Sequence, residues 1–149
     1  MSLHYEVVFS LFLRDDTPVE VLDELRWHLG VTDEPPAVRA LPDVDWPALR
    51  PQEETGWLPG ADVAQLRRQY RTTRLGVDNY AWALHARCCW YDDERDHVWW
   101  DMAAWLAPYA AEEGYAGFYR EESEDVPTVL LVRGGRAHEW RPGQEPKAI

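Results

Sequence analysis

The sequence predicts a single α+β domain, residues 1–149, in which an antiparallel sheet carries two helices packed on one face. Several segments alternate apolar and polar residues, as half-buried strands do, and two others show the spacing of amphipathic helices. Turns rich in Gly, Asn and Asp separate neighbouring strand segments. A chain of 149 residues can bury a core without a metal or a disulfide.

The first strand and the first helix carry the clearest signals. Residues 5–13 alternate regularly, which places apolar side chains on one face of a strand and a mixed set on the other. Thr17 is a good N-cap, Pro18 suits the first helical position, and Glu20 completes a capping box. Gly30 then predicts a left-handed stop to the helix.

Residues 31–64 predict an irregular, proline-rich acidic loop. Loops of this length are uncommon inside a compact domain, and they are often functional or wrapped on the surface. We expect Trp46 and Trp57 to pin the loop to the body of the domain. Its acidic residues are Asp33, Glu34, Asp43, Asp45, Glu53, Glu54 and Asp62.

The second half of the chain predicts a hairpin, a second helix and closing strands. The helix should span about residues 97–112, with Pro108 bending or shortening its last turn. The element order resembles the ferredoxin-like split βαβ plan, extended by the long Pro-rich loop and by a C-terminal hairpin at Gly134-Gly135. Strands are expected at residues 66–75, 80–91, 115–121, 126–133 and 136–141, with residues 142–149 as a loose tail.

Charge and composition exclude several classes of partner. The net charge of −12 opposes binding to nucleic acid and to anionic membranes, because both need a positive field. No apolar stretch is long enough to span a bilayer and no signal peptide is recognisable, so we expect a cytoplasmic protein. Cys88 and Cys89 are sequence neighbours and poorly placed to bond each other. The spacing of ligand residues predicts no metal site, and no motif predicts a cofactor.

Nine tryptophans are more than one core should need. Trp82, Trp90 and Trp105 are interpreted as core residues, and Trp140 as an anchor of the last strand. The remaining rings predict an apolar, Trp-rich surface of a non-catalytic binding or assembly module, whose partner would be a second copy or another protein. The candidate interface residues are Trp27, Trp99, Trp100 and Leu106.

The alternative is a small-molecule binder or enzyme that uses the open face of the sheet. His85 would act as general acid or base, Glu6 would orient it, and Arg87 would hold an anion. Its ligand would be an apolar small molecule. The nearby basic cluster is expected to pair with surrounding carboxylates, with an anion-binding edge as the alternative, and consists of Arg67, Arg68, Arg71 and Arg74.

The outline is also similar to that of small α+β proteins that oxidise aromatic or porphyrin substrates. These proteins are open-face dimers with Trp, His and Asn near the ligand. In this chain Asn79, Trp82 and His85 lie along one strand, but Trp82 should face away from the other two.

Overall fold

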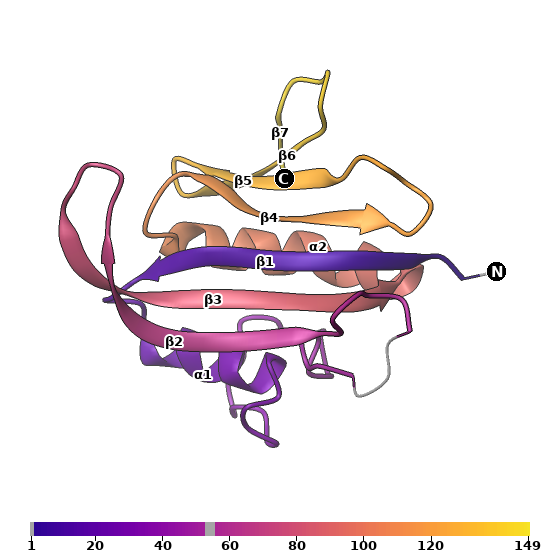
Figure 1. Cartoon of the computed structure of the whole chain (residues 1–149). Coiled ribbons are helices and arrows are strands. Elements are labelled where there is room, and N and C mark those ends of the chain that lie inside the picture. Colours follow the sequence, from indigo (N-terminus) through magenta and orange to yellow (C-terminus); the bar gives the residue numbers. More distant parts are fainter. Residues whose placement is uncertain (1, 53–55) are drawn as a thin grey trace.

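The computed structural model describes residues 2–52 and 56–149, and within them seven strands form one antiparallel sheet (Figure 1). Helices α1 (Val19–His28) and α2 (Asp92–Leu106) follow the first and third strands, and a 3-10 turn (Ala107–Tyr109) follows α2. The order across the sheet is β2-β3-β1-β4-β5-β6-β7. The strands are β1 (His4–Arg14), β2 (Val63–Thr72), β3 (Asp78–Tyr91), β4 (Gly114–Glu121), β5 (Thr128–Arg133), β6 (Arg136–Trp140) and β7 (Lys147–Ala148).

The predicted ferredoxin-like fold with two helices packed on one face is wrong, although the α+β class holds. The C-terminal hairpin is not an addition to a shorter sheet, because β4 to β7 pair in succession and form one sheet with the first three strands. Figure 1 shows α2 behind the middle of the sheet, whereas α1 lies below β2. Residue patterns could not reveal this extension, because strands are joined by backbone hydrogen bonds that almost any residue can make.

The ends of both helices differ in detail from the prediction. Helix α1 begins after Pro18, but Thr17 does not cap it, because the Thr17 hydroxyl donates to the backbone oxygen of Arg14 at 2.6 Å. Helix α2 begins at Asp92 rather than near His97. Asp92, Asp93 and Glu94 form its first turn, where negative charge is stabilised by the helix dipole.

The predicted C-terminal hairpin is confirmed, whereas the loose tail is not. Strands β5 and β6 pair around Gly134 and Gly135, which both have positive φ angles. Residues Lys147–Ala148 add β7 to the edge of β6. Pro108 lies in the 3-10 turn, so the predicted shortening of the second helix is confirmed.

The core lies between the sheet and α2. Alternate residues of β1 and β3 face this layer, among them Val7, Phe9 and Ala86. Trp99 of α2 is fully buried, with its ring 5.1 Å from that of Phe9. Its indole nitrogen donates to Glu139 of β6 at 2.8 Å, so the buried N–H group has a partner.

The predicted loop between α1 and β2 is irregular, but part of it belongs to the core. Four of its residues pack against the sheet and helices and are buried: Leu41, Val44, Ala48 and Leu49. The indole nitrogen of Trp90 on β3 donates to the backbone oxygen of Ala48 at 2.8 Å, which fastens the loop to the sheet. Glu53 and Glu54 of the predicted acidic loop lie outside the described residues.

Two buried ionisable side chains fix the loop to α1. The Glu24 carboxylate accepts hydrogen bonds from the backbone nitrogens of Ala40 and Leu41, at 2.6 and 2.9 Å. The backbone N–H of Ala48 points to Nδ1 of His28 at 3.4 Å, which favours the neutral imidazole. Burial, helped by the charge of Arg39, lowers the pKa of His28 to about 4.

We predict that His28 makes the protein sensitive to moderate acid. The unfolded chain binds a proton at His28 near the ordinary pKa of 6.5, whereas the folded protein binds it only near 4. Stability should therefore fall as the pH drops through this window, by roughly 3 kcal/mol in total. Urea unfolding at several pH values would measure it. The His28→Asn variant, which keeps an acceptor for the Ala48 N–H, should lose most of this pH dependence. Parallel pH profiles for the two proteins would contradict the prediction.

Candidate functional site

The sheet face opposite α2 carries a row of apolar side chains. The register places Val8, Phe118, Val129 and Trp140 side by side across β1, β4, β5 and β6. Leu131 lies on the same face, because its neighbours Leu130 and Val132 belong to the core on the other side. Phe118, Val129, Leu131 and Trp140 are half-buried and lie outside the core cluster. We call this face the open face, and we call these four side chains together with Val8 the apolar row.

A bulge in β4 adds Tyr115 to the open face. Tyr115 pairs with Leu131 and Gly117 with Leu130, so Ala116 is the extra residue in β4. Gly117 has a φ of 146°, and a Cβ atom at this position would lie 2.0 Å from the backbone oxygen of Val8. Only glycine allows β4 to approach β1 this closely.

Residues 57–61 cover one end of the open face. Leu58 is buried there, and the ring of Trp57 stacks on that of His4 with centroids 4.1 Å apart. The Arg87 guanidinium donates to the backbone oxygen of Pro59 at 2.5 Å. Trp57 remains 54% exposed, so only the side of its ring that stacks on His4 holds the loop to the sheet.

Glu6 and Arg87, two of the three predicted site residues, meet in an ion-pair network. The Glu6 carboxylate accepts from Arg87 at 2.8 Å and from Arg120 at 3.1 Å. Burial alone would raise the pKa of Glu6, but the two guanidinium groups outweigh it and the pKa lies below its usual value. Glu6 and Arg87 therefore neutralise each other, which leaves Arg87 poorly suited to hold a ligand anion.

His85 does not join this network. Its Nδ1 lies 3.1 Å from the hydroxyl of Ser10, the residue directly opposite on β1. Glu6 is paired with Cys89, four positions further along β3, so it does not orient the imidazole. Among the described residues, only the Ser10 hydroxyl lies within hydrogen-bond distance of the His85 imidazole. The predicted catalytic arrangement of His85, Glu6 and Arg87 is therefore not brought together.

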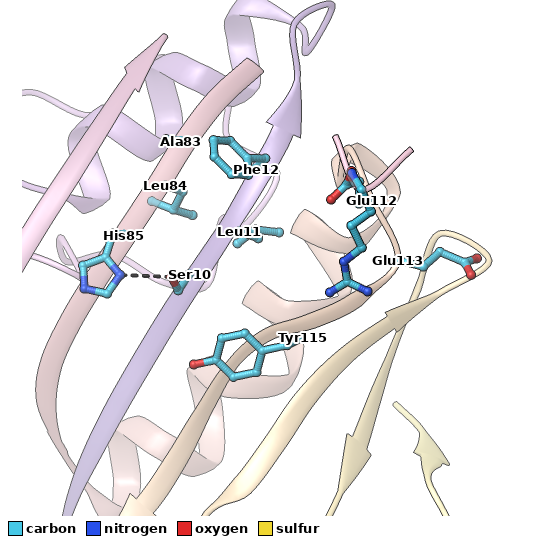
Figure 2. Close-up of a pocket in the computed structure, with 10 residues that line it drawn as sticks. Ser10, Leu11, Phe12, Ala83, Leu84, His85, Glu112, Glu113 and Tyr115 are labelled. Carbon is cyan, nitrogen blue, oxygen red and sulfur yellow. Dashed lines mark hydrogen bonds between the residues drawn. The ribbon is translucent and has the colours of Figure 1, made fainter. Parts of the chain in front are cut away.

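A cleft of about 370 Å³ opens beside His85 (Figure 2). Its polar lining comes from four parts of the chain: Ser10, Arg74, His85, Glu112, Glu113 and Tyr115. Leu11, Phe12, Ala83 and Leu84 complete the wall. The cleft therefore joins the Ser10–His85 pair of the sheet centre to the Tyr115 end of the open face.

The arginines near the cleft differ in their partners. The side chain of Arg71 is only 6% exposed, pairs with Glu112 at 2.5 Å and covers the ring of Phe12. The predicted pairing with carboxylates holds for Arg71, and for Arg68, which binds Asp15 through two nitrogens. It does not hold for Arg74, whose guanidinium contacts no carboxylate within the described part of the chain.

Sequence reasoning assigned no role to Ser10 or Tyr115. The register of β1 against β3 places Ser10 opposite His85, but the sequence does not give this register. Tyr115 was hidden by the bulge, because regular alternation places it opposite Phe118. Burial raises the pKa of Tyr115, and the charge of Glu6 adds to the effect, so the hydroxyl is a neutral hydrogen-bond donor.

The candidate interface residues are placed mainly in the interior. Trp27, Trp99 and Leu106 are buried, and Trp100 is half-buried against the core. The Arg39 guanidinium lies 5.0 Å from the centre of the Trp27 ring, so the loop after α1 covers this side of the helix. These residues do not form an exposed Trp-rich surface.

Trp82 of β3 faces the core, as Leu84 does, and so lies on the opposite face of the sheet from Asn79 and His85.

The described residues show neither a reactive thiolate nor a metal site. Cys88 and Cys89 are free and buried, and burial raises the pKa of Cys89 to about 11. No group of three His, Cys, Asp or Glu side chains in residues 2–52 and 56–149 could hold a metal ion.

In the same ranges no helix combines the length and the apolar character needed to cross a membrane. Comparison with models of protein families, with curated proteins and with solved structures found no match.

We predict that Glu6→Gln lowers the free energy of unfolding by about 1–2 kcal/mol at neutral pH, since two charge-assisted hydrogen bonds weaken. The folded-state pKa of Glu6 lies below the ordinary 4.5, so its contribution is complete above that pH. The difference between wild type and variant should shrink as the pH falls below about 4.5. Urea unfolding of both proteins over this range would measure it. A difference that does not change with pH would show that the ion pairs are not its source.

Proposed function

We propose that this protein binds a small amphipathic organic molecule on the open face of its sheet and does not catalyse a reaction. One observation carries the proposal. A cleft of about 370 Å³, lined by hydrogen-bonding groups, opens beside the half-exposed apolar row. Its volume lies at the lower end of the range for small-molecule sites, and the mixture of apolar wall and few polar groups is typical of them.

A binding role fits the geometry better than catalysis. His85 has a hydroxyl partner but no carboxylate that would fix its tautomer, and Glu6 is neutralised by two arginines. The net charge of −12 argues against nucleic acid or an anionic membrane as the partner. The two free, buried cysteines support a cytoplasmic location.

We predict that benzyl alcohol, a neutral amphipathic probe, shifts the backbone amide signals of residues 10–12, 83–85 and 113–115 in an NMR titration. Tyr115→Ala should weaken this binding about fivefold or more, because the ring supplies apolar contact area. Tyr80→Ala is the matched control, because Tyr80 is 47% exposed against 50% for Tyr115 and lies away from this cleft. An absence of shifts around the cleft, or equal weakening by both substitutions, would refute the proposal.

A second candidate is self-assembly through the same face. The observation in its favour is the apolar row itself, which α2 and α1 leave uncovered. Exposed contiguous apolar area commonly marks a protein interface. Two copies would each carry a net charge of −12, so salt that screens their repulsion should strengthen the contact.

If the open face dimerises, sedimentation velocity should show a dimer at roughly 100 μM that grows more populated from about 0.05 to 0.5 M salt. Val129→Glu should then give a monomer, because it places a charge in the middle of the apolar row. Val126→Glu, in the turn before β5, should leave the dimer intact. A monomer under all these conditions would exclude this candidate.

A further inference from the structure

Arg74 is held in place while its guanidinium forms no ion pair with a carboxylate of the described residues. It lies in the turn between β2 and β3, which is closed by hydrogen bonds from Val77 to the hydroxyl of Thr73 and from Thr73 to the oxygen of Val77. The backbone nitrogen of Arg74 donates to Glu112 at 3.4 Å, which ties the turn to the wall of the cleft. A Cβ atom at Gly114 would lie 3.7 Å from a guanidinium nitrogen of Arg74, so the head group reaches that wall.

The two carboxylates of the cleft are already engaged. Glu112 pairs with the buried Arg71 at 2.5 Å. Glu113 accepts the backbone N–H of Gly134 at 2.6 Å, and in Figure 2 its carboxylate lies away from His85 and Ser10. Neither carboxylate lies within ion-pair distance of the Arg74 guanidinium. The hydrogen bond from Arg71 is the main cause of the lowered pKa of Glu112, and the charge of Arg74 adds to it from a longer distance. The one arginine that lines the cleft therefore forms no ion pair among the described residues.

Neutral hydrogen-bond donors and apolar side chains share the cleft with this cation. Ser10, His85 and the hydroxyl of Tyr115 can donate to an oxygen of a ligand. Leu11 and Phe12 supply apolar surface for the rest of it. Guanidinium groups bind planar carboxylates through two parallel hydrogen bonds.

On the basis of the proposed small-molecule site, we infer that its ligand is a monocarboxylate with a compact apolar body, and that Arg74 binds the carboxylate. The polar side chains of Ser10, His85 and Tyr115 complete the polar end of the site, and the apolar body lies toward Phe12 and the apolar row. A phosphate dianion fits less well, because Glu112 and Glu113 lie in the same cleft and would repel its second charge.

The test compares three probes in NMR titrations of the whole protein: benzoate, benzyl alcohol and inorganic phosphate. Benzoate should bind the wild type about tenfold more tightly than benzyl alcohol, since a charge-assisted pair with Arg74 adds to the shared ring contacts. Arg74→Gln should abolish this preference and leave the binding of benzyl alcohol unchanged. Arg74→Lys should restore part of it, because an ammonium keeps the charge but loses the paired geometry.

Arg67→Gln is the matched control, because Arg67 is another exposed arginine of the same hairpin and lies outside the cleft lining. It should leave the preference for benzoate intact. The inference is overturned if benzoate binds no more tightly than benzyl alcohol, if phosphate binds as tightly as benzoate, or if both Gln substitutions reduce the preference equally. If benzyl alcohol binds and benzoate binds no more tightly, the inference that the ligand is a carboxylate is refuted, whereas the proposed binding function stands. Failure of both organic probes to shift the cleft signals would refute the binding function as well.

Discussion

The pairing of β1 with β3 is the constraint on which the rest of the structure depends. The two strands pair residue for residue from His4 opposite Tyr91 to Arg14 opposite Ala81. Because side chains alternate along each strand, this single register decides which residues face α2 and which face the open side. It places Ser10 beside His85 and keeps Glu6 away from it. A shift by one residue would exchange the core with the site.

The layer behind the sheet is filled from two directions. Helix α2 is in contact with β1 and β3 on one side, and its Trp105 approaches His28 of α1 on the other. This position explains why the helix is apolar around so much of its circumference. The loop after α1 completes the layer with buried aliphatic residues, and Glu24 satisfies the backbone nitrogens that this irregular segment would otherwise bury without partners. Of the tryptophans expected on a surface, Trp27 and Trp99 are buried in this layer and Trp100 is half-buried against it.

Local signals in the sequence predicted local structure well and spatial arrangement poorly. The first strand, the left-handed stop at Gly30 and the hairpin at Gly134-Gly135 are confirmed, because each depends on a few adjacent residues. The seven-stranded sheet and the burial of Trp99 depend on contacts between distant segments, which composition and periodicity do not record. For the site, alternation placed His85 and Glu6 on the open face, but only the register shows that Ser10, rather than Glu6, is the neighbour of His85.

The bulge in β4 shows that spacing along the sequence does not by itself tell which face of the sheet a residue occupies. With Ala116 as the extra residue, Tyr115 and Phe118 reach the same face of the sheet, although three positions separate them. Deletion of Ala116 would remove the bulge but leave Tyr115 opposite Leu131 on the open face, because Tyr115 and Phe118 would then be two positions apart in a regular strand. What the strand would lose is the Ala116 side chain, which is buried in the core. Among natural variants of this chain, one residue fewer between Tyr115 and Gly117 should therefore cost core packing and leave Tyr115 in the cleft.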